Sequence, residues 1–146
     1  MKYILIVLLC LLFTLSVKTQ TTSEVEKTEQ EIETFILAKE NSEGNIIEDI
    51  EILGIKDIPL HCYIDLTLSK PTLIKIKVIA VKVKRLRKNS KVIALQYKTK
   101  NDENGAAFSI KPSGKFWNEG NYRIEVYLDK KLAESKNFAV KKSKSK

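Results

Sequence analysis

Residues 60–68 read LHCYIDLTL, and apolar and polar side chains alternate through this stretch without interruption. The apolar positions are Leu60, Cys62, Ile64, Leu66 and Leu68. Successive side chains of a β-strand point to opposite faces of its sheet, so this alternation predicts a strand with one buried and one solvated face. A strand of that kind is typical of an antiparallel sheet that packs against a second layer.

The same alternation recurs on both sides of this stretch and predicts about eight short strands. The predicted strands are residues 31–39, 46–53, 60–68, 73–87, 92–100, 107–111, 122–128 and 132–140. Clusters of Asn, Asp, Ser, Gly and Pro separate them, and no useful helical periodicity occurs. Within 73–87 the apolar residues expected to be buried fall on even-numbered positions up to Val78 and on odd-numbered positions from Ile79. This change of parity predicts a β-bulge at Val78-Ile79. Short strands at this spacing predict an antiparallel sandwich or barrel over residues 31–140.

Residues 116–140, FWNEGNYRIEVYLDKKLAESKNFAV, resemble the last hairpin of immunoglobulin-like β-sandwich domains from exported bacterial proteins. In that pattern a Trp and a Gly precede a Tyr-led strand, a tight turn follows, and a Phe-x-Val strand ends the domain. The matching positions are Trp117, Gly120, Tyr122, Val126, Tyr127, Leu128, Asp129, Leu132, Phe138 and Val140. Lys130 stands where such hairpins often carry glycine. The resemblance implies an all-β immunoglobulin-like sandwich of seven or eight strands, a fold that hosts many functions.

The first residues of the 146-residue chain predict a secretory signal peptide. Lys2 is followed by an apolar run over 4–15, and small or polar residues come next. The run is shorter than the roughly 20 apolar residues that span a bilayer, although an uncleaved anchor is the alternative. We expect a signal peptide over 1–19, a flexible leader over 20–30 and a basic tail over 141–146. The protein is then secreted or periplasmic, with no transmembrane segment after cleavage.

Loss of the signal peptide removes Cys10 and leaves Cys62 as the single cysteine, so we expect no intramolecular disulfide. Cys62 shares the buried parity of its strand, whereas His61 falls on the opposite face, which argues against a catalytic thiolate–imidazole pair. None of the common nucleophile, metal, phosphate or dinucleotide motifs occurs. We therefore expect a protein that is not an enzyme and that holds no metal or cofactor.

Six basic residues within ten positions form the most prominent chemical feature of the chain. They are Lys82, Lys84, Arg85, Arg87, Lys88 and Lys91, around the tip of a predicted hairpin. Such a cluster can contact phosphates, sulfates or uronates, and Lys98 and Lys100 on the next strand are expected to broaden it. No aromatic residue is interleaved, which together with export disfavours nucleic acid. The alternative is that these lysines only solvate the strand and protect a sheet edge.

Charge is also divided along the chain. Eleven acidic and three basic residues lie over 23–57, whereas bases dominate from residue 58 onward. This asymmetry indicates either an anionic partner or pairing of the acidic segment with basic strands inside the fold.

Trp117 is a second candidate binding residue. It can stack on a sugar ring or plug the open end of the core, and the second role fits sandwich precedent better. Together these features predict a non-enzymatic exported binding or assembly module, whose partner is a protein or an anionic polysaccharide or envelope component. The alternatives are a small inhibitor or accessory subunit of an exported enzyme, and a unit that exchanges a strand with a neighbouring chain. The sequence leaves the oligomeric state open.

Overall fold

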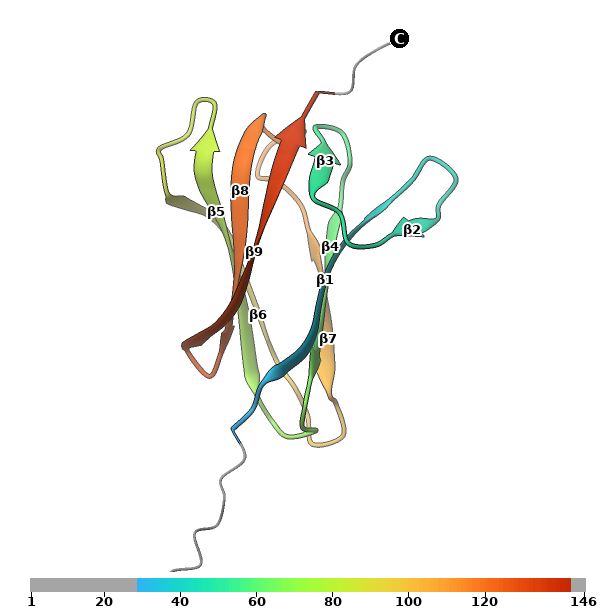
Figure 1. Ribbon diagram of the computed structural model, residues 1–146, viewed down its shortest axis with the longest axis vertical. Coiled ribbons are helices and arrows are strands. Elements are labelled where there is room, and N and C mark those ends of the chain that lie inside the picture. Colours follow the sequence, from blue (N-terminus) through green and yellow to red (C-terminus); the bar gives the residue numbers. More distant parts are fainter. Residues whose placement is uncertain (1–28, 143–146) are drawn as a thin grey trace, which may run out of the picture.

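The computed structural model describes residues 29–142, which form β-strands and connecting turns (Figure 1). The strands are β1 (Ile32–Glu40), β2 (Ile46–Ile47), β3 (Ile52–Gly54), β4 (Leu60–Leu66), β5 (Leu73–Val83), β6 (Ser90–Lys98), β7 (Gly105–Ile110), β8 (Gly120–Leu128) and β9 (Lys131–Lys141). Over this range we find no helix with the length and apolar character needed to span a bilayer. The predicted signal peptide, most of the predicted leader and residues 143–146 of the predicted tail lie outside the described residues.

The strands form two layers. One sheet has the order β2-β1-β4-β7, and the other has the order β3-β9-β8-β5-β6. All neighbouring strands are antiparallel except β3 and β9, which pair in parallel. Figure 1 shows the two layers side by side, with the described chain entering at one end of the sandwich and leaving at the other. The predicted antiparallel sandwich is confirmed, with nine strands in the described residues.

The core lies between the two sheets and follows the alternation of the sequence. Every second residue of β4, from Leu60 to Leu66, is at most 1% exposed. The facing sheet contributes the alternating residues of β5 and β8, among them Ile76, Val78 and Ile124, which are fully buried. Burial of a side chain of this size contributes about 1.5–3 kcal/mol, so more than twenty such residues offset much of the conformational entropy lost on folding.

Cys62 belongs to this core, as its parity predicted. The side chain is fully buried, and burial raises the pKa of its thiol to about 12. No disulfide occurs in residues 29–142. The neighbouring His61 lies on the outer face of β4, where its Nδ1 atom is 3.4 Å from the Ser109 hydroxyl. The two side chains therefore point to opposite sides of the sheet.

The predicted single strand over 46–53 is wrong, because the chain changes sheets there. β2 pairs with β1, whereas β3 pairs with β9 in the opposite layer. Asp49, between them, has a φ of 51°, which breaks the extended backbone. Ile46 and Ile52 would share one face with Ile50 in a continuous strand, but they are 45% and 52% exposed whereas Ile50 is buried. The crossing turns Ile50 and Leu53 into the core instead.

The β-bulge predicted at Val78-Ile79 is confirmed by a register shift at that step between β5 and β6. A second shift, against β8, lies between Ala80 and Lys82. As a result Ala80 is fully buried and Val81 is only half-buried, contrary to the expected parity. β5 also ends at Val83 instead of the expected Arg87, since the chain turns at residues 84–89.

The β8–β9 turn consists of two residues, Asp129 and Lys130, with φ values of 46° and 76°. Positive φ at both central positions marks a type I′ turn, which favours glycine at the second. The Asp129 carboxylate accepts a hydrogen bond from the Leu73 N–H at 2.9 Å, and its own N–H donates to the Leu73 carbonyl at 2.9 Å. These bonds fix the turn to the start of β5 even though Lys130 occupies a glycine-favouring position.

Candidate functional site

The six predicted binding cations are all exposed. Lys82 lies near the end of β5, Lys91 lies at the start of β6, and the other four lie in or beside the turn that joins these strands. None of them takes part in the ion pairs found in the described part of the chain. Arg85 and Asn89 adopt positive φ values of 68° and 55° in this turn, which reverse the direction of the backbone between β5 and β6. The predicted basic hairpin therefore exists, and its charges face solvent.

Lys98 and Lys100 do not broaden the cluster, contrary to expectation. β6 runs away from the hairpin tip, and Lys98 pairs with Leu73 at the far end of β5. At about 3.4 Å per residue, Lys98 is about 24 Å along the strand from Lys91. The expectation relied on the closeness of these two lysines to the cluster in the sequence. In the structure, β6 carries them away from the cluster toward the other end of the sandwich.

A second loop, over residues 111–119 between β7 and β8, packs beside the basic hairpin. The Lys84 N–H donates to the Glu119 carbonyl at 3.1 Å, and Val83 pairs with Gly120. Gly120 has a φ of 149°, and a Cβ atom there would lie 2.4 Å from the Lys82 carbonyl oxygen. Only glycine allows this close approach, so Gly120 couples the two loops.

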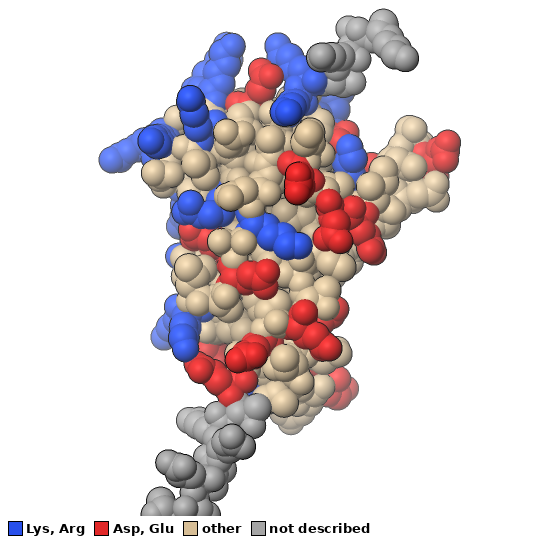
Figure 2. All heavy atoms as spheres, in the orientation of Figure 1, with Lys and Arg blue, Asp and Glu red and all other residues tan. Residues whose placement is uncertain are grey.

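Two further segments reach the same end of the sandwich. The Trp117 N–H donates to the Ile55 carbonyl at 3.0 Å, and the Ile55 N–H donates to the Lys141 carbonyl at 3.1 Å. These loops and the end of β9 carry five exposed lysines that the sequence did not connect with the hairpin. We call the basic end the set Lys56, Lys84, Arg85, Arg87, Lys88, Lys111, Lys115, Lys141 and Lys142. Figure 2 shows the blue side chains gathered at this end, over the tip of β5 and the end of β9.

Trp117 lies beneath the basic end and not on its surface. Its indole is 4% exposed and contacts Tyr122 and Phe138 edge-on, with ring centroids 5.6 and 6.0 Å apart. Tyr122 and Phe138 stack on each other at 5.2 Å. The structure therefore places Trp117 in the role of a plug that closes the core, and not among the exposed residues that can stack on a sugar.

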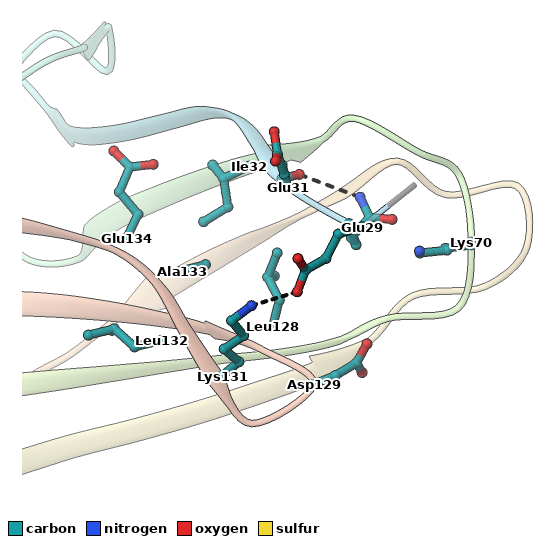
Figure 3. Close-up of a pocket in the computed structure, with 11 residues that line it drawn as sticks. Glu29, Glu31, Ile32, Lys70, Leu128, Asp129, Lys131, Leu132, Ala133 and Glu134 are labelled. Carbon is teal, nitrogen blue, oxygen red and sulfur yellow. Dashed lines mark hydrogen bonds and ion pairs between the residues drawn. The ribbon is translucent and has the colours of Figure 1, made fainter. Parts of the chain in front are cut away.

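The opposite end of the sandwich carries several charges that are paired. A groove of about 820 Å³ lies between the start of β1 and the β8–β9 hairpin, and Glu29 and Lys131 are among the residues that line it (Figure 3). Lys131 Nζ donates to Glu29 Oε1 at 2.6 Å. This hydrogen bond and the opposite charge lower the pKa of Glu29 and raise that of Lys131. The pair links the described N-terminal residues to the last hairpin.

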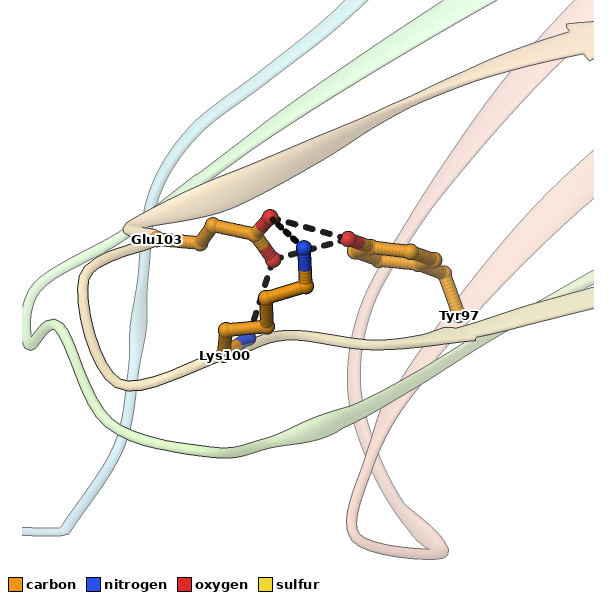
Figure 4. Close-up of polar contacts among 3 residues, drawn as sticks. All are labelled: Tyr97, Lys100 and Glu103. Atoms are coloured by element: carbon orange, nitrogen blue, oxygen red, sulfur yellow. Dashed lines mark hydrogen bonds and ion pairs between the residues drawn. The ribbon is translucent and has the colours of Figure 1, made fainter.

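A second set of paired groups lies in the turn between β6 and β7 (Figure 4). Glu103 accepts hydrogen bonds from the Lys100 N–H at 2.9 Å and from the Tyr97 hydroxyl at 2.8 Å. These two bonds lower the pKa of Glu103, and the bond to Glu103 raises the pKa of Tyr97. Tyr97 lies near the end of the edge strand β6 and is 40% exposed. We call Glu29, Tyr97, Lys100, Glu103 and Lys131 the paired end.

The acidic N-terminal segment pairs with basic strands in part. Glu29 pairs with Lys131, and Asp49 lies 3.5 Å from Lys136. Asp57 pairs within the acidic segment itself, 2.7 Å from Lys39. Partial burial opposes ionisation of Asp57, but hydrogen bonds from Lys39 and from the Gly54 N–H outweigh it and lower the pKa of Asp57. Internal pairing therefore accounts for several acids and leaves the basic hairpin unneutralised.

No protein-family model matches the chain, and no curated protein sequence matches it. Solved structures do match. An immunoglobulin-like protein from Pseudomonas aeruginosa has 17% identity and a TM-score of 0.48, with 77% of this chain and 97% of that chain covered. An alkylpurine DNA glycosylase from Pseudomonas fluorescens, bound to DNA with an abasic site analogue, has 11% identity and a TM-score of 0.45. The second similarity covers 77% of this chain and 30% of the glycosylase chain.

The strand order of the structure itself identifies the fold. β1, β4 and β7 take the places of strands A, B and E of an immunoglobulin domain, and β5, β8 and β9 take those of C, F and G. The Tyr122 hydroxyl, near the start of β8, donates to the Asn118 carbonyl at 2.9 Å, which is the tyrosine corner of such sandwiches. The chain folds as an immunoglobulin-like β-sandwich.

Proposed function

We propose that the protein is a non-enzymatic exported binding module whose basic end contacts an anionic component of the cell envelope, such as an acidic polysaccharide. The observation that carries the proposal is the gathering of nine exposed cations from four segments at one end of the sandwich. The four cations of the hairpin turn have no ion-pair partner among residues 29–142. Cations concentrated in this way create a positive potential that attracts anionic groups.

The rigid support beneath the basic end strengthens the proposal. The hairpin and the loop over 111–119 are coupled through Gly120, and Trp117 closes the core below them. Cations held on such a support lose little conformational freedom of the backbone when they bind, which favours affinity. A non-enzymatic role is supported by the placement of His61 and Cys62 on opposite faces of β4, where they cannot act together.

The proposal is tested by retention on a heparin resin as the salt concentration is raised. We expect the wild-type protein to be retained and a variant with Lys84, Arg85, Arg87 and Lys88 changed to Ala to elute at much lower salt. The matched control changes Lys98, Lys100, Lys130 and Lys131 to Ala, which removes the same charge from elsewhere on the sandwich. Equal loss of retention in both variants would show that only net charge matters and would contradict a localised site.

A further inference from the structure

The basic end also exposes two large apolar side chains. Leu86, in the turn between β5 and β6, is 36% exposed, and Phe116, in the loop between β7 and β8, is 43% exposed. Exposed apolar residues are common when they are scattered singly, but here two lie on neighbouring loops that bond to each other through Lys84 and Glu119. The same end therefore combines apolar side chains with cations.

Cations flank both apolar residues directly. Leu86 lies between Arg85 and Arg87, and Phe116 follows Lys115, whose Nζ atom lies 5.4 Å from the centre of the phenyl ring. A solvated anion is recognised by cations alone and gains nothing from an exposed leucine. A bilayer surface offers both partners, since anionic headgroups attract lysine and arginine while the headgroup–acyl boundary accepts apolar side chains.

The loops that carry Leu86 and Phe116 are anchored to the sandwich. Phe116 directly precedes the buried Trp117, and the Leu86 N–H donates to the Val83 carbonyl at 3.2 Å. The core beneath them stays closed, so insertion of the two side chains requires no opening of the fold. The apolar tips and the surrounding cations are thus presented together by one rigid end of the molecule.

We propose that the anionic component is a lipid surface, on which the basic end docks with Leu86 and Phe116 inserted among the headgroups and the surrounding cations on lipid phosphates. This inference rests on the proposed function, because it needs the basic end to bind anions. It adds an apolar contact that a soluble polyanion does not require. Lipid phosphates lie in a plane, which suits cations that are gathered at one end of an elongated sandwich.

The test is co-sedimentation of the purified protein with lipid vesicles. One set of vesicles is pure phosphatidylcholine, and the other is an equimolar mixture with phosphatidylglycerol. We expect binding to the anionic vesicles and little binding to the neutral ones. Changing Leu86 and Phe116 together to Ser is expected to lower partition into anionic vesicles by about tenfold or more while leaving retention on heparin unchanged.

A matched control changes Leu132 and Tyr97 to Ser, since these side chains are 53% and 40% exposed and lie at the opposite end of the sandwich. This control should bind vesicles like the wild type. Retention of the wild type on heparin without binding to anionic vesicles would overturn the lipid inference and leave the proposed function standing. Unchanged vesicle binding by the Leu86/Phe116 variant would also overturn it, and failure to bind either heparin or vesicles would overturn both proposals.

Discussion

At the paired end, Lys131 contacts Glu29 and Glu103 accepts hydrogen bonds from Tyr97 and Lys100, whereas at the basic end the cations of the hairpin turn contact no opposite charge in the described residues. Both ends of the sandwich consist of loops and turns between the same two sheets. At the paired end several charged groups connect segments of the chain. At the other end the cations of the hairpin turn face solvent, so the difference separates charges that already have a partner within the protein from charges available to a binding partner.

Like charges that are gathered in one place repel each other and destabilise the compact state. At the paired end this cost is relieved inside the protein by opposite charges. At the basic end it persists until an anion neutralises it, and a ligand that binds only the folded state stabilises that state. The comparison therefore predicts that the two ends respond differently to substitution.

Trp117→Ala is expected to have the largest effect, because it removes the aromatic plug beneath the basic end. Truncation of a buried aromatic side chain costs about 3–5 kcal/mol, from lost burial and from the cavity left beside the stacked rings of Tyr122 and Phe138. Urea denaturation followed by circular dichroism measures the change. Trp117→Phe is the control, since it keeps a ring in the site and should recover much of the loss. A loss below about 1 kcal/mol for the alanine variant would contradict the role of Trp117 as a plug.

Lys130→Gly is expected to stabilise the protein by about 1 kcal/mol, because Lys130 has a φ of 76° and glycine adopts this conformation without a steric penalty. Thermal and urea unfolding measure the change. Lys130→Ala removes the same charge and keeps the Cβ atom, so it should bring no comparable gain. If both variants gained equally, relief of charge repulsion and not of backbone strain would be the cause.

Glu103→Gln is expected to have the smallest effect on stability. We expect that effect to depend on pH and to be accompanied by a change in the pKa of Tyr97. In the wild type the Glu103 carboxylate raises the pKa of Tyr97, so the substitution should return the pKa of Tyr97 toward 10.0. Because the folded-state pKa of Glu103 is lowered, its contribution is present above pH 4.5 and is lost as the pH falls through the folded pKa. The stability difference between wild type and variant should therefore shrink in acid.

Titration of Tyr97 by NMR, together with urea denaturation at several pH values, tests both parts of this expectation. Glu119→Gln removes a carboxylate from the basic-end side of the sandwich and serves as the control. It should leave the pKa of Tyr97 unchanged. A Tyr97 pKa that does not move in Glu103→Gln would show that the hydrogen bonds of Figure 4 do not persist in solution.

Local alternation predicted most of the buried faces, because strand side chains repeat every two residues whatever the fold. The burial of Leu60, Cys62, Ile64 and Leu66 followed from parity alone. The same rule failed over 46–53, where the chain crosses between sheets, and at Val81, where a second register shift changes the parity. The alternation of apolar residues shows which side chains share a face only while the strand is continuous. It no longer predicts burial once the strand pairs with a different neighbour.

The sequence by itself determined the all-β character, the inward faces of the long strands and the cluster of cations at residues 82–91. Only the tertiary structure decided that Lys56, Lys111, Lys115 and Lys141 join that cluster, that Lys98 leaves it, and that Trp117 lies beneath it. The features that the sequence determined depend on contacts within one strand or turn. The features that the tertiary structure decided depend on strand direction and on hydrogen bonds between loops far apart in the chain.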